Sequence, residues 1–212
     1  MKFAKTYSHE DCGFCLSVSH AKLNQIRSSG AGAHEAYFAN QEMSLKLWVV
    51  ISGIELTLRN RASSFLIAEF GAELFGSEAW RLGDAARSRI EKVIGRSRGS
   101  NLTIDALTTQ LPFSFWTLLF SKRMESYCWP VLFQNLLTDS APRTRGVLYA
   151  RLQESLELRN RIAHHEVVLK AKYQGALERQ LEVLSWICED FRREAEDRIN
   201  FSLQPVESPH EQ

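Results

Sequence analysis

The chain of 212 residues is 44% hydrophobic, which is ample for one core of ordinary domain size. Its 26 lysine and arginine residues are balanced by 25 aspartate and glutamate residues. The net charge therefore does not favour nucleic-acid binding, which would need a local basic patch. The residues after Met1 are polar and charged, so we expect no secretory signal and a cytoplasmic protein. Four cysteines are too few for a disulfide scaffold, and we expect free thiols.

The most apolar run, LWVVISGIEL, is the best candidate for a membrane-spanning segment. It is interrupted by Ser52, Gly53 and Glu55, and it is well short of the roughly 20 residues needed to span a bilayer. We therefore expect no membrane segment, and a buried helix at this place in the chain.

Hydrophobic periodicity predicts an all-α protein. Apolar residues recur with a helical period in most windows, whereas hairpin dipeptides and sustained alternation are absent. We expect a compact bundle of about six to nine helices in a single domain over 1–200, followed by a flexible tail over 201–212.

Two helical segments are predicted before residue 70. Ser17 or Ser19 is placed to cap a short helix through Arg27, and the glycines of SSGAGA then form a loop. From about 35 to 70 the apolar pattern predicts a long central helix or a pair of helices. Its apolar stripe contains or borders Leu45, Trp48, Val49, Ser52, Leu56 and Arg59.

The best basic patch of the sequence lies on the next predicted helix, over about 78–94 and ending near Gly95. Only Glu91 opposes the positive charges, so we expect this patch to contact RNA phosphates. The patch consists of Arg87, Arg89, Lys92, Arg96 and Arg98.

An aromatic segment, FSFWTLLF, follows a short helix that Thr103 caps and Pro112 ends. Its Phe113, Phe115 and Trp116 could stack on nucleobases. Next to TLLF, however, these rings are expected to fill the core.

Two further helices complete the predicted bundle. One runs from about 143 toward 168 and carries the segment LRNRIAHHE in its second half. The other spans about 173–199, and its apolar residues recur at alternating spacings of four and three, which suits packing inside the fold or a dimer seam. Those residues are Leu177, Leu181, Leu184, Cys188 and Phe191.

The segment LRNRIAHHE gathers two arginines, an asparagine and two histidines in nine residues. On a helix, Asn160 and His164 share one face, with Glu157 one turn earlier. Arg161 and His165 share the adjacent face. Such a cluster is either a catalytic site or a solvated polar face.

These side chains suit phosphodiester chemistry. Imidazole takes and returns protons near neutral pH, and the guanidinium fork matches phosphate oxygens. For RNA no metal is required, because a base can activate the ribose 2′-hydroxyl, an acid can protonate the leaving 5′-oxygen, and an arginine can stabilise the added charge. Arg159 reaches toward His164 if the helix loosens there or if a second copy of the segment faces the first.

The arginine-rich half of this segment occurs a second time, as LTLRNR, one hundred residues earlier. Its Arg59 and Asn60 correspond to Arg159 and Asn160, but a serine stands where the later copy has His164. Without that titrating group the first copy is expected to be structural or to position substrate phosphate.

Taken together, IELTLRNR, LPFSFW and LRNRIAHHE resemble, in this order and spacing, the Abi-like (abortive infection) proteins of bacteria. The resemblance covers residues 17–170 and leaves 1–16 as a variable N-terminal segment. The last motif is also similar to that of the wider HEPN superfamily, all-α domains with a metal-independent ribonuclease site. In that superfamily the active unit is usually a homodimer whose two motifs face one cleft.

The resemblance implies an antiphage or toxin endoribonuclease that needs no cofactor or metal. It implies Arg159, Asn160 and His164 as the catalytic residues. The supporting residues would be Arg161, His165 and Glu157. His165 offers an alternative register, and His164 is our choice. RNA is the implied substrate, and an inhibitory antitoxin, protein or RNA, is a candidate partner.

Two other functions are open on the sequence. The same fold could bind RNA or a nucleotide through Arg159 and the basic patch without chemistry. It could also be an interaction protein in which LRNRIAHHE is an interface held by salt bridges such as Glu157 to Arg161.

A metal or redox site near the N-terminus is not expected. His9, Cys12, Cys15 and His20 lie within twelve residues, a tighter spacing than zinc ligands usually have. CGFC lacks the surrounding strands that a thioredoxin-like site requires.

Overall fold

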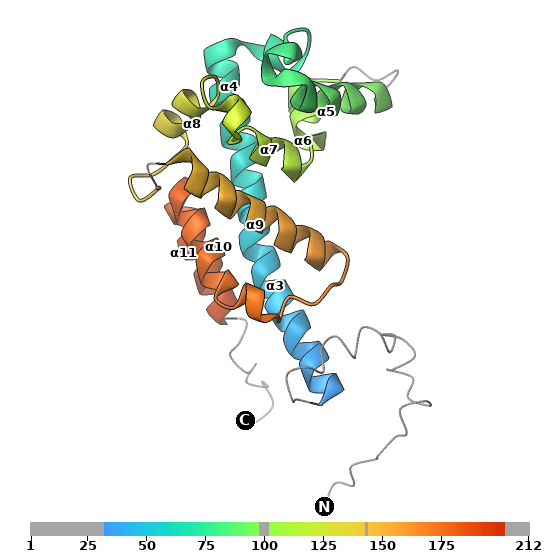
Figure 1. Ribbon diagram of the computed structural model, residues 1–212, viewed down its shortest axis with the longest axis vertical. Coiled ribbons are helices and arrows are strands. Elements are labelled where there is room, and N and C mark those ends of the chain that lie inside the picture. The colour runs from blue at the N-terminus through green and yellow to red at the C-terminus, as the bar shows by residue number, and fades with distance from the viewer. Residues whose placement is uncertain (1–31, 98–101, 143, 202–212) are drawn as a thin grey trace, which may run out of the picture.

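The computed structural model describes residues 32–97, 102–142 and 144–201, and in these residues it contains helices and turns but no strand. The predicted all-α bundle is therefore confirmed for the described part of the chain. Figure 1 shows the long helix α3 (Ala33–Thr57) running through the molecule, with α9 (Arg145–Ala163) lying across it and the last two helices packed beside it.

Short helices make up the rest of the bundle. They are α4 (Ser63–Phe70), α5 (Gly83–Arg96), α6 (Ile104–Gln110), α7 (Phe113–Leu118), α8 (Trp129–Asn135), α10 (Ala176–Ile187) and α11 (Glu189–Phe201). The 3₁₀ turns η3 (Ala72–Phe75), η4 (Ala79–Leu82), η5 (Lys122–Met124) and η6 (Ala171–Tyr173) connect them.

Some predictions fall outside the described residues. These are the helix from Ser17 or Ser19 to Arg27, the segment 1–16, the cluster of His9, Cys12, Cys15 and His20, the patch residue Arg98, and the tail from 202 onward. In the described ranges, no helix is long and apolar enough to cross a bilayer.

The helix predicted over 35–70 is one rod with a change of pitch. At its end, α3 passes into a π-helical turn, η2 (Leu58–Ala62), and then directly into α4. The sequence of that turn is LRNRA, so the first copy of the arginine motif occupies it. π-Helical turns within helices are rare and occur frequently at functional sites.

The predicted apolar stripe of this rod faces solvent rather than the core. The residues that α3 buries completely are Leu47, Val50, Ile51 and Ile54. In contrast, Leu45 is 67% exposed, Trp48 and Val49 are each 41% exposed, and Leu56 is 39% exposed. The second half of the helix carries apolar residues on two faces, so periodicity did not distinguish the buried face from the exposed one.

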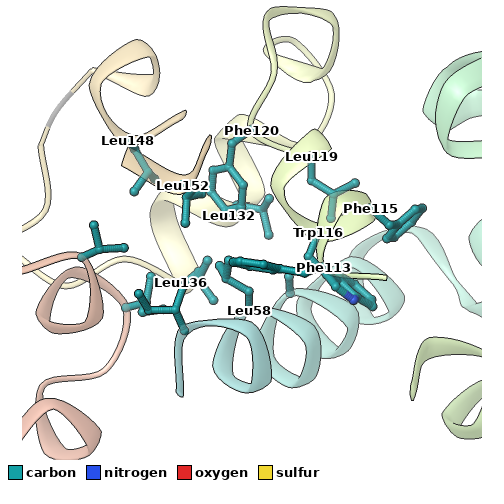
Figure 2. Packing of buried hydrophobic residues seen from close by; sticks show 14 of the residues in the cluster. Leu58, Phe113, Phe115, Trp116, Leu119, Phe120, Leu132, Leu136, Leu148 and Leu152 are labelled. Atoms are coloured by element: carbon teal, nitrogen blue, oxygen red, sulfur yellow. The ribbon is translucent and has the colours of Figure 1, made fainter. Parts of the chain in front are cut away.

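The aromatic segment lies in the core, as predicted. Phe115 and Trp116 are fully buried and meet edge to face, with ring centroids 4.9 Å apart. Figure 2 shows Trp116 together with Leu58 of the π-helical turn and Leu132 of α8 in the shared interior. The first arginine motif is thus anchored to the centre of the fold through its leucine.

Two helix starts can be compared with the sequence. Thr103 caps α6 as predicted, since its hydroxyl accepts a hydrogen bond from the Ala106 amide at 3.2 Å. The helix predicted from about 78 starts later, because a 3₁₀ turn comes first and α5 begins only at Gly83, whose φ is 74°.

The helix predicted over 173–199 is broken into α10 and α11 at Cys188, where the backbone is extended (φ −162°, ψ 97°). Both helices pack against α3. Phe191 lies so close to Gly53 that a Cβ there would approach the ring to 2.6 Å. Of the predicted stripe, Leu184 is fully buried, and Leu177, Leu181 and Phe191 are partly buried and pack against the core.

Candidate functional site

The motif LRNRIAHHE lies at the C-terminal end of α9 and in the turn that follows. Leu158 is fully buried and anchors this end of the helix in the core. Asn160, His164 and His165 are exposed, and Arg159 is half-buried. The polar residues of the motif are thus presented to solvent by a helix whose position is fixed by packing.

A helix-ending hydrogen-bond pattern, the Schellman motif, closes α9. The Glu166 amide donates to the Arg161 carbonyl at 2.7 Å, and the His165 amide donates to the Ile162 carbonyl at 2.9 Å. His165 has a left-handed backbone, with φ 55°. Among the described residues, no other non-glycine residue has a positive φ. Glycine is the usual occupant of this position because a Cβ is unfavourable there.

The predicted extension of this helix toward 168 is therefore wrong, since α9 ends at Ala163. His164 is its C-cap and still donates its amide to the Asn160 carbonyl at 3.0 Å, so these two residues keep the predicted helical relation. The left-handed turn takes His165 off the helix, so the face predicted for Arg161 and His165 together does not exist.

Arg161 is occupied by contacts within the chain. Its Nε and Nη2 donate to the Val167 carbonyl at 3.2 and 3.1 Å, and its Nη1 lies 3.1 Å from the Glu166 carboxylate. Its guanidinium also lies over the Tyr173 ring, 5.3 Å from the centroid. These contacts fold the side chain back onto the turn and make it structural.

Glu157 faces residues beyond the turn rather than Arg161. Its carboxylate accepts hydrogen bonds from Lys172 Nζ at 2.7 Å and Tyr173 Oη at 2.6 Å. These two donors lower the pKa of the Glu157 carboxyl, Lys172 most strongly. The proposed Glu157 to Arg161 salt bridge is thus replaced by two separate pairs.

Arg159 forms an ion pair with Glu55, a residue that was not predicted to belong to the site. Its Nε lies 3.7 Å from the Glu55 carboxylate of α3, one turn before Arg59. That Nε is buried and makes no hydrogen bond to any residue that the structure describes. In the first motif, Arg59 Nε donates to Asn60 Oδ1 at 3.4 Å. Glu55 thus links α9 to the helix that bears the first motif.

The last arginine of the first motif is structural. Arg61 donates from Nη1 to the Ile187 carbonyl at the end of α10, and from Nη2 to the Asn135 carbonyl at the end of α8, at 3.3 Å. Arg61 therefore joins the ends of two helices, much as Arg161 holds the segment after α9. This agrees with the structural alternative predicted for the first copy.

The basic patch of α5 is separate from the motif. Arg87 pairs with Glu91 at 2.7 Å, and Arg89 donates to the Ala85 carbonyl at 2.6 Å. Lys92 and Arg96 are exposed. α5 packs against η4, α6 and α7, and Figure 1 places it at one end of the molecule's long axis, away from the C-terminal end of α9.

A pocket of about 290 Å³ lies beside the histidine turn. It is lined by Asn40, Gln41, Ser44, Leu45, Trp48, Ile162, Ala163, His165 and Glu166. It therefore joins the exposed stripe of α3 to the turn, and His165 rather than His164 borders it. No cluster of histidine, cysteine, aspartate or glutamate suited to a metal ion occurs in the described ranges.

Because His165 has a left-handed backbone, replacing it with glycine should stabilise the protein. We expect His165→Gly to raise the free energy of unfolding by about 0.5–1 kcal/mol, because glycine relieves the Cβ contact at φ 55°. Urea unfolding monitored by circular dichroism measures the change. His164→Gly is the matched control and should lower stability, since φ is −96° at that residue. Equal destabilisation by both glycines would contradict the expectation.

Comparison with known proteins finds no matching protein family, no matching curated protein and no matching solved structure.

Proposed function

We propose that this protein is a metal-independent endoribonuclease of HEPN type, resembling the Abi-like proteins, which acts as a homodimer in bacterial antiphage defence or as a toxin. One observation carries the proposal. The motif places the exposed His164 one helical turn after Asn160, followed by the exposed His165, whose backbone is left-handed. Unfavourable backbone geometry of this kind is concentrated at active sites.

The chemistry follows from the groups at this turn. The His164 imidazole accepts the proton of a ribose 2′-hydroxyl, and the 2′-oxygen forms a bond to the adjacent phosphorus. Arg159 stabilises the added negative charge, and Asn160 orients the phosphate. The bond from phosphorus to the 5′-oxygen breaks, and a second imidazole, His165 or that of a facing motif, protonates the 5′-oxygen. The products are a 2′,3′-cyclic phosphate and a 5′-hydroxyl.

The exposed stripe of α3 supports the homodimer. Four large apolar side chains, Leu45, Trp48, Val49 and Leu56, lie on solvent in the described structure, and contiguous apolar surface on a protein usually marks an interaction site. Leu45 and Trp48 also line the pocket at the histidine turn. A second copy seated on the stripe would therefore bring its own motif toward the first.

A charge placed in the stripe tests this interface. We expect Leu45→Glu to convert the dimer to a monomer in sedimentation equilibrium, because association would bury an unpaired carboxylate. The fold should be unaffected, since Leu45 is 67% exposed. Trp80→Glu is the control, because Trp80 is 63% exposed but lies outside the stripe. A Leu45→Glu protein that remains dimeric would place the interface elsewhere.

The second candidate is a catalytically inactive module that binds RNA or a nucleotide. The pairing of Arg159 with Glu55 favours it, because a carboxylate beside the guanidinium reduces the positive charge available to a transition state. Cleavage of end-labelled RNA by the purified protein in EDTA separates the two. Salt-dependent RNA binding without products would support the module.

A further inference from the structure

The segment that follows the histidine turn is held by a buried side chain from the other end of the sequence. Asn40 of α3 is 3% exposed. Its Oδ1 accepts hydrogen bonds from two consecutive backbone amides, those of Val168 at 2.8 Å and Leu169 at 3.2 Å. One oxygen therefore satisfies both amides and fixes the segment to α3.

Arg161 holds the same segment from the other helix. It donates two hydrogen bonds to the carbonyl of Val167, the residue directly before the pair that Asn40 holds. Val167 and Val168 are buried, at 1% and 2% exposure. Three consecutive residues are thus fixed by side chains from α3 and α9 together.

The three residues 164–166 bridge the end of α9 and this fixed segment. Two of them are the histidines, whose side chains are exposed. Because the left-handed backbone of His165 is intrinsically unfavourable, the turn keeps its shape only while the structure on both sides holds it. On one side this is α9, and on the other it is the segment that Asn40 and Arg161 hold.

We propose that Asn40 is a positioning residue for the imidazoles of His164 and His165, acting through the backbone of Val168 and Leu169. The inference rests on the proposed function, because it assigns Asn40 a part in orienting that site. Asn40 itself acts through the turn and need not touch RNA. Removing its side-chain oxygen leaves the buried Val168 amide and the part-buried Leu169 amide without their acceptor, and lets the turn and its imidazoles move.

The test compares Asn40→Ala with Asn40→Asp. A carboxylate keeps an acceptor for both amides, so Asn40→Asp should retain wild-type behaviour, whereas Asn40→Ala should lower kcat for RNA cleavage by about 10- to 100-fold with KM little changed. Two-dimensional NMR of the histidine rings, assigned by single substitutions, gives a readout independent of cleavage. The ring signals of His164 and His165 should shift in Asn40→Ala and should stay in place in a control variant that leaves Asn40 intact.

Ser155→Ala is the matched control for lost stability. Ser155 is fully buried on α9 and shares a hydrogen bond of 2.5 Å with Gln180 of α10, so its loss also removes a buried polar contact. This variant should leave kcat and the ring signals unchanged. If Asn40→Ala does not fold, Asn40→Gln replaces it, because the same amide displaced by one methylene should shift the signals and lower kcat.

The outcomes separate this inference from the proposed function. Unshifted ring signals in a folded Asn40→Ala or Asn40→Gln protein would overturn the inference, whether or not the wild type cuts RNA. Shifted signals with full cleavage would also overturn it. Shifted signals in a protein whose wild type cuts no RNA would leave Asn40 as the residue that holds the turn and would remove the proposed nuclease.

Discussion

We expect the His164→Ala protein to cut RNA about 10²- to 10⁴-fold more slowly than the wild type, because the substitution removes the group that takes the 2′-hydroxyl proton. The fold should not change, since His164 is the exposed C-cap residue of α9. The initial rate of cleavage of an end-labelled RNA, measured on proteins shown to be equally folded and equally dimeric, gives the effect.

Two comparisons sharpen this result. His34→Ala changes another exposed histidine, at the start of α3, and should cut like the wild type. His165→Ala distinguishes the two registers of the histidine pair, because His165 borders the pocket whereas His164 keeps the helical relation to Asn160. A rate that falls with His165→Ala and not with His164→Ala would transfer the role of general base to His165.

The second large effect is on stability. Trp116→Ala should lower the free energy of unfolding by about 3–5 kcal/mol, because it removes a fully buried ring from the centre of the core. That ring contacts Phe115 edge to face at 4.9 Å and lies 6.2 Å from the Phe75 ring, measured between centroids. The change is large enough to unfold a marginally stable domain.

Trp80→Ala is the matched substitution for this prediction. Trp80 is 63% exposed, so its replacement should change the free energy of unfolding by no more than about 0.5 kcal/mol. Urea unfolding of both variants measures the difference. Equal losses of stability would mean that the aromatic segment is not the centre of the core.

The all-α class and the centre of the core were predictable from local patterns. The helical period gave the all-α class, Thr103 gave the start of α6, and the aromatic run after Pro112 gave the centre of the core. Each of these signals resides in a few neighbouring residues. These predictions therefore did not depend on tertiary contacts with the rest of the chain.

The face that α3 buries was not predictable in the same way. Its sequence is apolar on two sides, and the side that faces inward is decided by α10, α11 and α9, which pack there. The stripe containing Leu45 and Trp48 was left on solvent as a result. Such an outcome depends on tertiary packing, which a single periodic pattern does not contain.

The end of α9 was missed for a different reason. Helix ends of this type are usually signalled by glycine, and here a histidine takes the left-handed position. The side-chain contacts to the segment after the turn come from Arg161 nearby and from Asn40, which is 128 residues away from Val168. Local sequence predicted the residues of the candidate site but not the turn that presents them.

Whether the motif cuts RNA without a metal is decided by the ends of the products. Purified wild-type protein is incubated with end-labelled RNA in EDTA, beside His164→Ala, and the ends of the products are identified. We expect fragments with 2′,3′-cyclic phosphate and 5′-hydroxyl ends from the wild type, and almost none from the variant. Products with 3′-hydroxyl ends, cutting that EDTA abolishes, or equal cutting by both proteins would contradict it.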